Sequence, residues 1–328
     1  WSSDVCSSDL PAVRRGGRRR VAGRSRYLAG VTQTSPLVQS RQIGRFAAHA
    51  IQAGYQALDG GAMFGVVPKT LWQRRIPADD RNRISLGMRC LAIEHEAGLV
   101  VIDTGAGNKE DTKFKDIYGL VNEAPEPEAD GSRRTMLEAG LAAIGRTPAD
   151  VRWVINTHLH FDHAGGNTYL DAAGVVRPSF PNARYVVQAG EHHWATHTNE
   201  RTAASYFGKN WDPIIAEGRF DFIEGDREIL PGLSSLRTPG HTPHHQSILI
   251  DGGDGIACFL GDICPTAAHL PLPWIMGYDV EPLVSLETKR WLLRRAVAER
   301  WLLIYEHDAT TAWTRVRHDG KAYVTDPD

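Results

Sequence analysis

The stretch Val151-Arg-Trp-Val-Ile-Asn-Thr-His158-Leu-His160-Phe-Asp162-His163 decides how this chain is interpreted. Its first half has the apolar composition of a buried strand, and its second half carries three histidines and one aspartate within six residues. Because side chains two positions apart on an extended backbone point the same way, His158 and His160 are predicted to converge on one cation. Asp162 and His163 follow the bend and are predicted to face a second cation. The motif therefore predicts a metal centre at a strand end.

Three further candidate ligands lie where predicted strands give way to loops. They are His241 after Leu233–Arg237, Asp262 after Ile256–Leu260, and His307 after Leu302–Tyr305. Strand ends on one edge of a sheet are where α/β folds place their sites. Together with the loop, these residues supply five histidines and two aspartates. That set is enough for two cations, each with roughly three or four nitrogen or oxygen ligands and a position left open for water.

The rest of the chain mixes strand and helix patterns. Ser85–Glu94 and Leu99–Asp103 are predicted to form an antiparallel pair that turns at His95–Gly98. The other predicted elements are a helix at Thr135–Gly145, a short helix from Thr147-Pro148, strands at Val151–Asn156, Tyr185–Gln188 and Ser247–Asp251, and a helix at Leu286–Trp301. We therefore expect a layered α/β fold with sheet in the middle and helices outside.

Composition excludes several classes of protein. Lys plus Arg (37) nearly balances Asp plus Glu (39), so the 328 residues carry no basic field that would gather nucleic acid. No apolar run approaches the roughly 18 residues of a membrane span. The four cysteines form no Cys-x-x-Cys pair, which argues against a zinc ribbon and against a disulfide framework. We expect a cytoplasmic protein with a small-molecule substrate and no nucleic-acid or membrane partner, and a homodimer is compatible with this composition.

The first 40 residues differ from the rest. Residues 1–26 hold seven Arg and two Asp, a net charge of +5, and the opening Trp1 to Leu10 lacks both periodicity and an initiator Met. An arginine-rich nucleic-acid arm and a twin-arginine signal are alternatives, but no apolar segment follows the arginines. We interpret residues 1–40 as a disordered or non-native leader and residues 41–328 as one folded domain.

The order His-x-His-x-Asp-His, then His, Asp and His, resembles the hallmark of the metallo-β-lactamase fold hydrolases. The resemblance covers about Arg41 to the C-terminus and implies a four-layer αβ/βα sandwich with metals in a cleft at the sheet edge. It implies that His158, His160 and His241 hold a first metal, that Asp162, His163 and His307 hold a second, and that Asp262 bridges them. It also implies that Asp103, in Asp103-Thr-Gly105, orients neighbouring groups without binding metal.

Within that family, Thr238-Pro-Gly-His-Thr-Pro-His-His-Gln-Ser247 is similar to the N-acyl homoserine lactonase and methyl parathion hydrolase group. The His at position 160 disfavours the flavo-diiron oxidoreductases, which have Glu there. Lactonases of the group carry a carbonyl-polarising Tyr three residues beyond the bridging Asp, and here that position is Pro265. The stretch Gly261–His269 looks closer to methyl parathion hydrolase. Lactone hydrolysis would then rely on the metals alone, or on another donor such as Tyr278 or His269.

Two zinc-like cations about 3.5 to 4 Å apart would lower the pKa of a shared water toward roughly 7, so that a metal-bridging hydroxide acts as nucleophile. Correspondingly, no Gly-x-Ser-x-Gly occurs in the chain. Asp162 is the predicted catalytic side chain, because it can bind metal and also orient or shuttle the proton. Ligation by nitrogen and oxygen alone suits two Zn²⁺ and also admits iron, manganese or cobalt.

Three functions are compatible with these residues. Hydrolysis of lactones, aryl esters or related neutral substrates is favoured, because the apolar Pro271–Tyr278 stretch suggests a pocket wall without an anion clamp, although core packing explains that stretch equally well. An organophosphate or other phosphoester hydrolase, or a nuclease, would want basic residues near the metals. Lys109, Lys113 and Lys115 are the nearest cluster, and a solvated face is the alternative interpretation of them. A non-catalytic metal-binding protein is disfavoured because no ligand position is degraded.

Five further histidines besides His269 are weaker candidates. His244 and His245 flank the His241 loop, and they are interpreted either as supports that orient ligands by hydrogen bonding or as structural or surface residues. His192, His193 and His197 lie on a predicted helix without the His-Glu-x-x-His order of a zincin, and we interpret them as surface residues.

Overall fold

The computed structural model describes residues 35–126 and 134–326, so residues 1–34 of the predicted leader lie outside the described part. Strand β1 (Val38–Ile43) begins inside the predicted leader and pairs antiparallel with β2 (Phe46–Asp59). Val38 lies opposite Ile51 and packs against the apolar cluster that contains it. The predicted boundary at residue 40 is therefore corrected to a position before Val38, because pairing with the long strand β2 draws these residues into the sheet.

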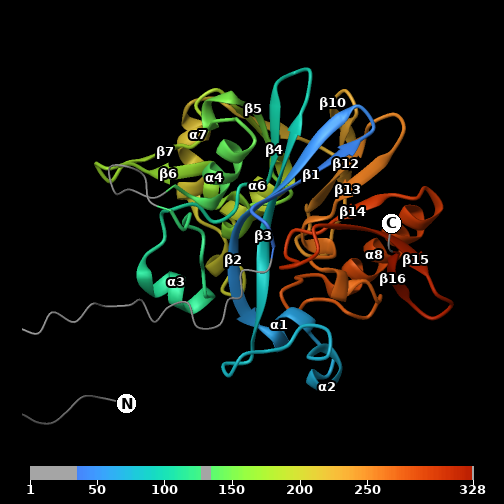
Figure 1. Cartoon of the computed structure of the whole chain (residues 1–328). Helices are drawn as coiled ribbons and strands as arrows, with labels where there is room; N and C mark the ends of the chain where they lie inside the picture. Colours follow the sequence, from blue (N-terminus) through green and yellow to red (C-terminus); the bar gives the residue numbers. More distant parts are fainter. Residues whose placement is uncertain (1–34, 127–133, 327–328) are drawn as a thin grey trace, which may run out of the picture.

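Two seven-stranded sheets form the middle of the molecule, as Figure 1 shows. The first has the order β1-β2-β3-β4-β5-β8-β9, and the second runs in sequence from β10 to β16. The other strands of the first sheet are β3 (Arg83–Glu94), β4 (Leu99–Ile102), β5 (Val151–Ile155), β8 (Arg184–Gln188) and β9 (Phe220–Ile223). Strands β1 to β4 are antiparallel neighbours, whereas β4, β5, β8 and β9 run parallel.

The second sheet is antiparallel except where β13 runs parallel to β14. Its strands are β10 (Arg227–Leu230), β11 (Leu233–Arg237), β12 (Gln246–Asp251), β13 (Ile256–Phe259), β14 (Leu302–Ile304), β15 (Trp313–His318) and β16 (Tyr323–Asp326). A separate hairpin joins β6 (Thr168–Leu170) to β7 (Val176–Pro178).

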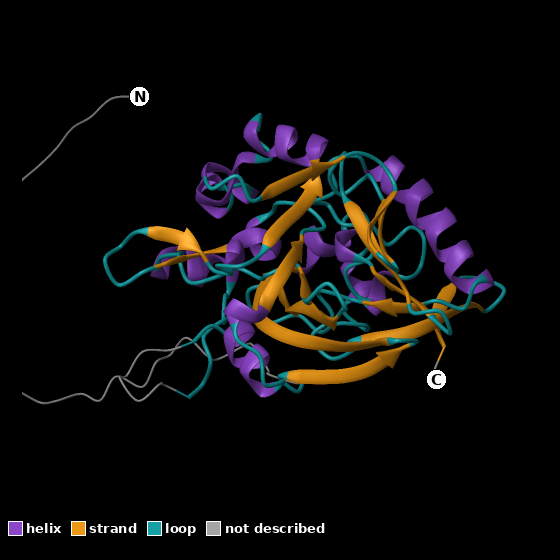
Figure 2. Ribbon diagram, turned by 90° about the horizontal axis from the view of Figure 1, so that it is seen from above, coloured by secondary structure: helices purple, strands orange, loops and turns teal. Residues whose placement is uncertain are grey.

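Apolar side chains on both faces of each sheet explain the layering. In β4, Val100 and Ile102 join the cluster between the two sheets, while Leu99 and Val101 join a cluster on the outer face. Helices α4 (Met136–Ala143) and α7 (Asp212–Ala216) contribute to that outer cluster. Helix α8 (Pro282–Ala298) covers the outer face of the second sheet through Leu292 and Leu293. Figure 2 shows helices on both outer sides, which confirms the predicted four-layer sandwich.

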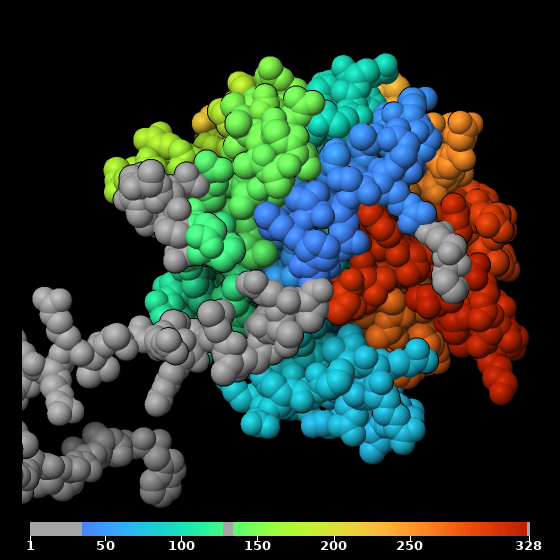
Figure 3. Space-filling model, in the orientation of Figure 1, coloured from blue at the N-terminus to red at the C-terminus, as the bar shows by residue number. Residues whose placement is uncertain are grey.

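The remaining helices are short. They are α1 (Gly60–Phe64), α2 (Lys69–Trp72), α3 (Thr112–Tyr118), α5 (Phe161–Ala164) and α6 (Ala189–Thr196). Single 3-10 turns are at Pro148–Asp150, Gly165–Asn167, Ala203–Ser205, Gly208–Asn210, Gly261–Ile263 and Ala267–His269. The α1–α2 segment, light blue in Figure 3, forms one end of the molecule. Within the described ranges, no helix has the length and apolarity that crossing a membrane requires.

Candidate metal centre

All seven predicted ligands meet where strands of both sheets end. The first group comprises His158, His160, His241 and Asp262, and the second comprises Asp162, His163 and His307. In each group the candidate ligand atoms lie within 4.8 Å of one another. The side chains come from the loops after β5, β11, β13 and β14, so the candidate metal centre lies where the two halves of the sandwich meet.

The backbone after β5 explains why one loop can serve both groups. His160 has extended dihedral angles and immediately precedes α5, so the chain turns from strand to helix at this residue. Asp162 and His163 lie on that helical turn and belong to the second group, while the His163 ring lies beside that of His158 with centroids 4.0 Å apart. Gly166 follows α5 and packs against Thr104, which follows β4. A Cβ on Gly166 would lie 2.1 Å from the carbonyl oxygen of Thr104, so only glycine fits there.

Hydrogen bonds fix which nitrogens of the second group carry protons. Nδ1 of His307 lies 2.8 Å from the carbonyl oxygen of Gly87, and Nδ1 of His163 lies 3.1 Å from Oδ2 of Asp103. Carbonyl and carboxylate oxygens only accept, so both Nδ1 atoms donate. If both imidazoles are neutral, their Nε2 atoms carry no proton and each presents a lone pair. These two Nε2 atoms lie 3.2 Å apart.

The acceptors that surround these lone pairs include Asp262 as well. Its Oδ1 lies 3.0 Å from Nε2 of His307 and 3.5 Å from Nε2 of His163. Asp162 adds Oδ2 at 3.6 Å from Nε2 of His307. When the imidazoles are neutral, none of these atoms carries a proton to share, and their convergence is then favourable around a bound cation. The donor set therefore fits a metal ion.

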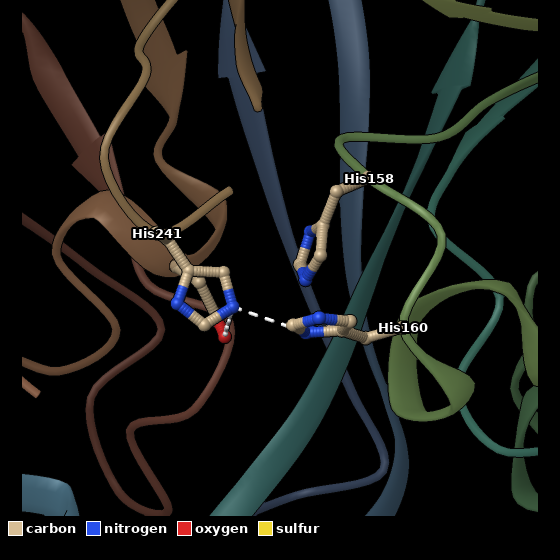
Figure 4. Close-up of side chains that lie close together, drawn as sticks. His158, His160 and His241 are labelled. Atoms are coloured by element: carbon tan, nitrogen blue, oxygen red, sulfur yellow. Dashed lines mark hydrogen bonds and ion pairs between the residues drawn. The ribbon is translucent and has the colours of Figure 1, made fainter. Parts of the chain in front are cut away.

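The first group repeats this arrangement. Nδ1 of His241 lies 3.0 Å from Oδ1 of Asp279, which leaves Nε2 bare and 3.1 Å from both Nδ1 of His160 and Oδ2 of Asp262. Nε2 of His158 is buried without a hydrogen-bond partner. Figure 4 shows His158 and His160 approaching from one loop and His241 from the other, with their ring nitrogens turned toward a common point.

Local charge also favours a cation. Burial alone would lower the pKa of His307, but the Asp262 carboxylate outweighs burial and raises that pKa to about 9. Burial would raise the pKa of the Asp262 carboxyl, yet the imidazoles of His307 and His163 hold it well below its usual range. Burial, with further lowering by neighbouring histidines, keeps the pKa of His158 well below its ordinary value. The carboxylates therefore give the centre a preference for positive charge.

Asp103 holds residues of the candidate centre through hydrogen bonds to Thr157 and His163. It has a left-handed backbone angle, with φ of 52°, and it is fully buried. Its carboxylate accepts from the backbone N (2.8 Å) and hydroxyl (2.6 Å) of Thr157, in addition to His163. These contacts match the orienting role that the family resemblance implies. Buried Glu306 also approaches Nδ1 of His163, at 2.9 Å, and burial raises the pKa of its carboxyl well above the ordinary value.

Sequence patterns did not indicate three buried polar side chains of the centre. Besides Glu306, these are Gln56 on β2, whose Nε2 donates to Oδ2 of Asp162 at 2.6 Å, and Asp279, the partner of His241. The available signal was a polar residue within or directly after a mainly apolar run. Gln56 interrupts the buried stretch of β2, and Asp279 follows the apolar stretch that ends at Tyr278.

The weaker histidine candidates separate into supports and surface residues. His245 is buried, accepts from the backbone N of Asp262 at 3.0 Å and pairs with the Thr238 hydroxyl at 2.8 Å. It therefore holds the Asp262 loop. His244 is partly exposed and packs on Gly190. On α6, His193 and His197 are exposed and His192 is half-buried against Phe222.

His269 does not supply the missing donor. One ring nitrogen lies 2.7 Å from the hydroxyl of Thr266 and the other 2.8 Å from the carbonyl oxygen of Met63. The ring also stacks on Phe64 with centroids 4.5 Å apart. Nε2 donates to the Met63 carbonyl and Nδ1 accepts from the Thr266 hydroxyl, so both nitrogens are occupied and His269 is excluded as the donor.

A cavity of about 420 Å³ lies over the metal centre. Its lining is mainly apolar, and the side chains that carry this character are Leu58, Ala62, Met63, Phe161, Met276 and Val280. Tyr118, Tyr278 and Arg201 add polar groups. Of the stretch Pro271–Tyr278, only residues 276–278 line this cavity, while Trp274 packs against an apolar cluster. Both interpretations of that stretch therefore apply, each to a different part of it.

The predicted basic cluster is not at the cavity. Lys109 is directed to the metal loop, where Nζ donates to the carbonyl oxygens of Gly165 and Thr168. Lys115 pairs with Glu123 at 2.8 Å. Neither these lysines nor Lys113 line the cavity. The cation that does line it is Arg201, which the sequence did not indicate.

Comparison with known proteins agrees with this geometry. A family model described as the metallo-beta-lactamase superfamily matches residues 89–307. An N-acyl homoserine lactonase from Bacillus cereus is 28% identical over 233 residues, which span 69% of this chain and 83% of the relative. The crystal structure of a probable metal-dependent hydrolase from Staphylococcus aureus is 32% identical, covers 88% of this chain and 99% of its own, and superimposes with a TM-score of 0.76.

A more distant structure shares the fold. AidC, described as a dizinc quorum-quenching lactonase in complex with a product, is 17% identical and has a TM-score of 0.72. The match covers 89% of this chain and 97% of AidC. Nearly the whole described part therefore corresponds to one architecture.

Proposed function

This chain belongs to the metallo-β-lactamase superfamily and is a metal-dependent hydrolase, and on that premise we propose that it is a dinuclear enzyme that hydrolyses lactones, aryl esters or related neutral substrates. The observation that carries the proposal is the convergence of unprotonated ring nitrogens and carboxylate oxygens beneath an apolar cavity. Residues 38–328, the predicted domain with its corrected boundary, form the hydrolase domain.

The two groups of side chains would each hold one divalent cation, with Asp262 between them. Its Oδ2 faces His241 of the first group and its Oδ1 faces His307 of the second, as a bridging carboxylate requires. When bound, two cations would lower the pKa of a water held between them toward roughly 7 and polarise the scissile group. Zinc suits this nitrogen and oxygen donor set, and AidC, which shares the fold, is described as dizinc.

Asp162 is the proposed catalytic side chain. It is buried, yet it lines the cavity, so it contacts both the metal position and the substrate space. Gln56 donates to its Oδ2 at 2.6 Å, which fixes the orientation of the carboxylate. A carboxylate held in this way can accept the proton of the attacking water and return it to the leaving group.

The apolar lining of the cavity favours neutral substrates. A lining dominated by Met, Leu, Phe and Val binds neutral groups, since burying a charged group there would leave it without partners. Tyr278 lines the same cavity and is 41% exposed, so its hydroxyl is the proposed donor to the substrate oxygen in place of the absent tyrosine. Pro265, at that position, instead accepts from the backbone N of His307 at 2.9 Å and so holds a ligand loop.

Organophosphate triesters are the second candidate. They are neutral, and the aromatic residues Tyr118 and Tyr278 suit their aryl groups. Phosphate monoesters fit less well, because Arg201 already donates to the carbonyl oxygens of Gly277 (2.6 Å) and Asp279 (3.4 Å).

A substrate panel tests the proposal. Zinc-loaded protein is assayed with an acyl homoserine lactone, an aryl ester, an aryl phosphotriester, a phosphodiester and a β-lactam, and kcat/KM is compared. We expect the lactone, the aryl ester or both to be best, with the phosphotriester next. Highest kcat/KM on the phosphodiester or the β-lactam would contradict the proposed substrate class.

A further inference from the structure

We infer that Asp279 is a positioning residue for the metal ligand His241, and that the segment 277–281 joins the substrate cavity to the first metal group. The inference rests on the proposed function for the existence of the metals. It does not depend on which substrate is hydrolysed.

The contact between Asp279 and His241 is direct and buried. Oδ1 of Asp279 lies 3.0 Å from Nδ1 of His241, and the two residues are 4% and 2% exposed. The other ring nitrogen of His241 faces His160 and Asp262. Asp279 therefore selects the tautomer whose bare Nε2 points at the metal position and restricts rotation of the ring.

Backbone contacts hold the segment 277–281 against the His241 loop. The backbone N of Val280 donates to the carbonyl oxygen of His241 at 3.2 Å, and the backbone N of Glu281 donates to that of Gly240 at 3.0 Å. At the other end, the backbone N of Gly277 donates to the carbonyl oxygen of Ala62 at 2.7 Å. Both ends of the segment are thereby fixed.

Alternate residues of this segment face different partners. Tyr278 and Val280 line the cavity, while Asp279, between them, contacts His241. Arg201 approaches from the loop after α6 and donates to the carbonyl oxygens on both sides of Tyr278. The residues that contact the substrate and the residue that orients His241 are therefore neighbours in one fixed segment.

In the second metal group, Nδ1 of His163 faces its own carboxylates, Asp103 and Glu306, whereas Nδ1 of His241 faces Asp279. Loss of Asp279 should therefore weaken one metal position and spare the other. Mutation of such partners of metal-bound histidines typically costs about 10- to 100-fold in metal affinity.

Metal titration of Asp279 variants tests the inference. Asp279→Ala and the isosteric Asp279→Asn are titrated with Zn²⁺ against a chelator of known affinity, and Co²⁺ spectra report the ligand field of each position. In Asp279→Ala we expect the dissociation constant of one ion to rise by about 10- to 100-fold, and the Co²⁺ spectrum of that position alone to change. In Asp279→Asn we expect a smaller rise in the same dissociation constant. Glu281→Gln, two residues along, is the matched control and should bind both ions as the wild type does.

The outcomes separate the two proposals. Unchanged affinities in both Asp279 variants, or equal weakening of both ions, would overturn the role of Asp279 even if the wild type hydrolyses lactones. Selective weakening of one ion would support that role even if the wild type hydrolyses none of the proposed substrates. If Asp279→Ala does not fold, as judged by circular dichroism, the result for Asp279→Asn decides.

Discussion

The metal centre and the cavity wall above it are built in opposite ways. At the centre, buried partners fix each ring that they contact, as Gly87 fixes His307 and Asp103 fixes His163. The wall is formed by segments far apart in the sequence, and Tyr278 on it is 41% exposed. If the proposed function holds, the reaction class depends on tightly held side chains, whereas substrate choice depends in part on a side chain that is far less constrained.

The largest expected effect comes from the centre itself. Asp262→Ala removes a carboxylate that faces both groups, so we expect kcat/KM to fall by about 1000-fold or more, at least as much as losing a single oxyanion donor. Steady-state kinetics on the best substrate of the panel measures it. A loss below about tenfold, with wild-type metal content, would mean that the centre tolerates the same variation as the wall.

A smaller and substrate-dependent effect is expected on the wall. Tyr278→Phe should lower kcat/KM for a long-chain lactone by about 100-fold, since one oxyanion donor is lost, and should lower it less for an aryl ester with a good leaving group. Tyr118→Phe, across the same cavity, is the matched control. A strong preference for the lactone that survives Tyr278→Phe would exclude this hydroxyl as the donor.

Anchoring of the wall should have a still smaller effect on activity. Buried Lys289 donates from Nζ to the carbonyl oxygens of Pro271 (2.9 Å) and Trp274 (2.7 Å), just before the residues that line the cavity. Lys289→Met should loosen this support, and we expect KM to rise a few-fold, roughly 1 kcal/mol of uniform binding, with kcat unchanged. Loss of bound metal in this variant would show that wall and centre are not separable here.

The same lysine gives a pH dependence of stability. Burial lowers the pKa of Lys289 to about 8 from 10.5, so between these values the unfolded chain binds more protons than the folded one. The free energy of unfolding should therefore gain a contribution as pH rises from about 8 to 10.5, and lose it as pH falls through about 8. Denaturant unfolding of wild type and Lys289→Met across this range checks it, and parallel curves would contradict the prediction.

The smallest effect is expected at His244. It is partly exposed, and the contact that the structure gives it is with Gly190 rather than with a ligand. His244→Ala should leave kcat/KM within about threefold of the wild type, as for most surface substitutions. A loss comparable to that of Asp262→Ala would show that a support has been mistaken for a surface residue.

Much of the fold could be predicted because its signals are local. Leu99–Ile102 and Val151–Ile155 are continuous apolar runs, as strands with two buried faces must be. Edge strands such as β10 were missed, since three of its four residues are exposed or half-buried and leave little pattern. The helix predicted from Leu286 begins at Pro282, because proline is favoured in a first helical turn. Leu283 and Val284 in that turn are exposed, so they do not follow the apolar period of the buried face.

In the candidate site, too, the residues with a local sequence signal could be predicted and the others could not. The seven predicted ligands follow strands directly, so a short pattern indicates each of them. Gln56 lies 106 positions from Asp162, and Asp279 lies 38 from His241, so only the folded chain brings these pairs together. Lys109 was named on charge alone, as part of a basic cluster near the metals or of a solvated face, whereas its ammonium group holds the backbone after the metal loop.

The most direct test of the dinuclear centre is the number of metal ions bound. Purified protein is loaded with zinc, freed of excess metal by dialysis, and measured by elemental analysis against protein concentration. Seven converging ligands exceed what one tetrahedral ion can use, so we predict about two zinc ions per chain. A saturating ratio of about one, unchanged by higher zinc concentration during loading, would contradict the dinuclear centre.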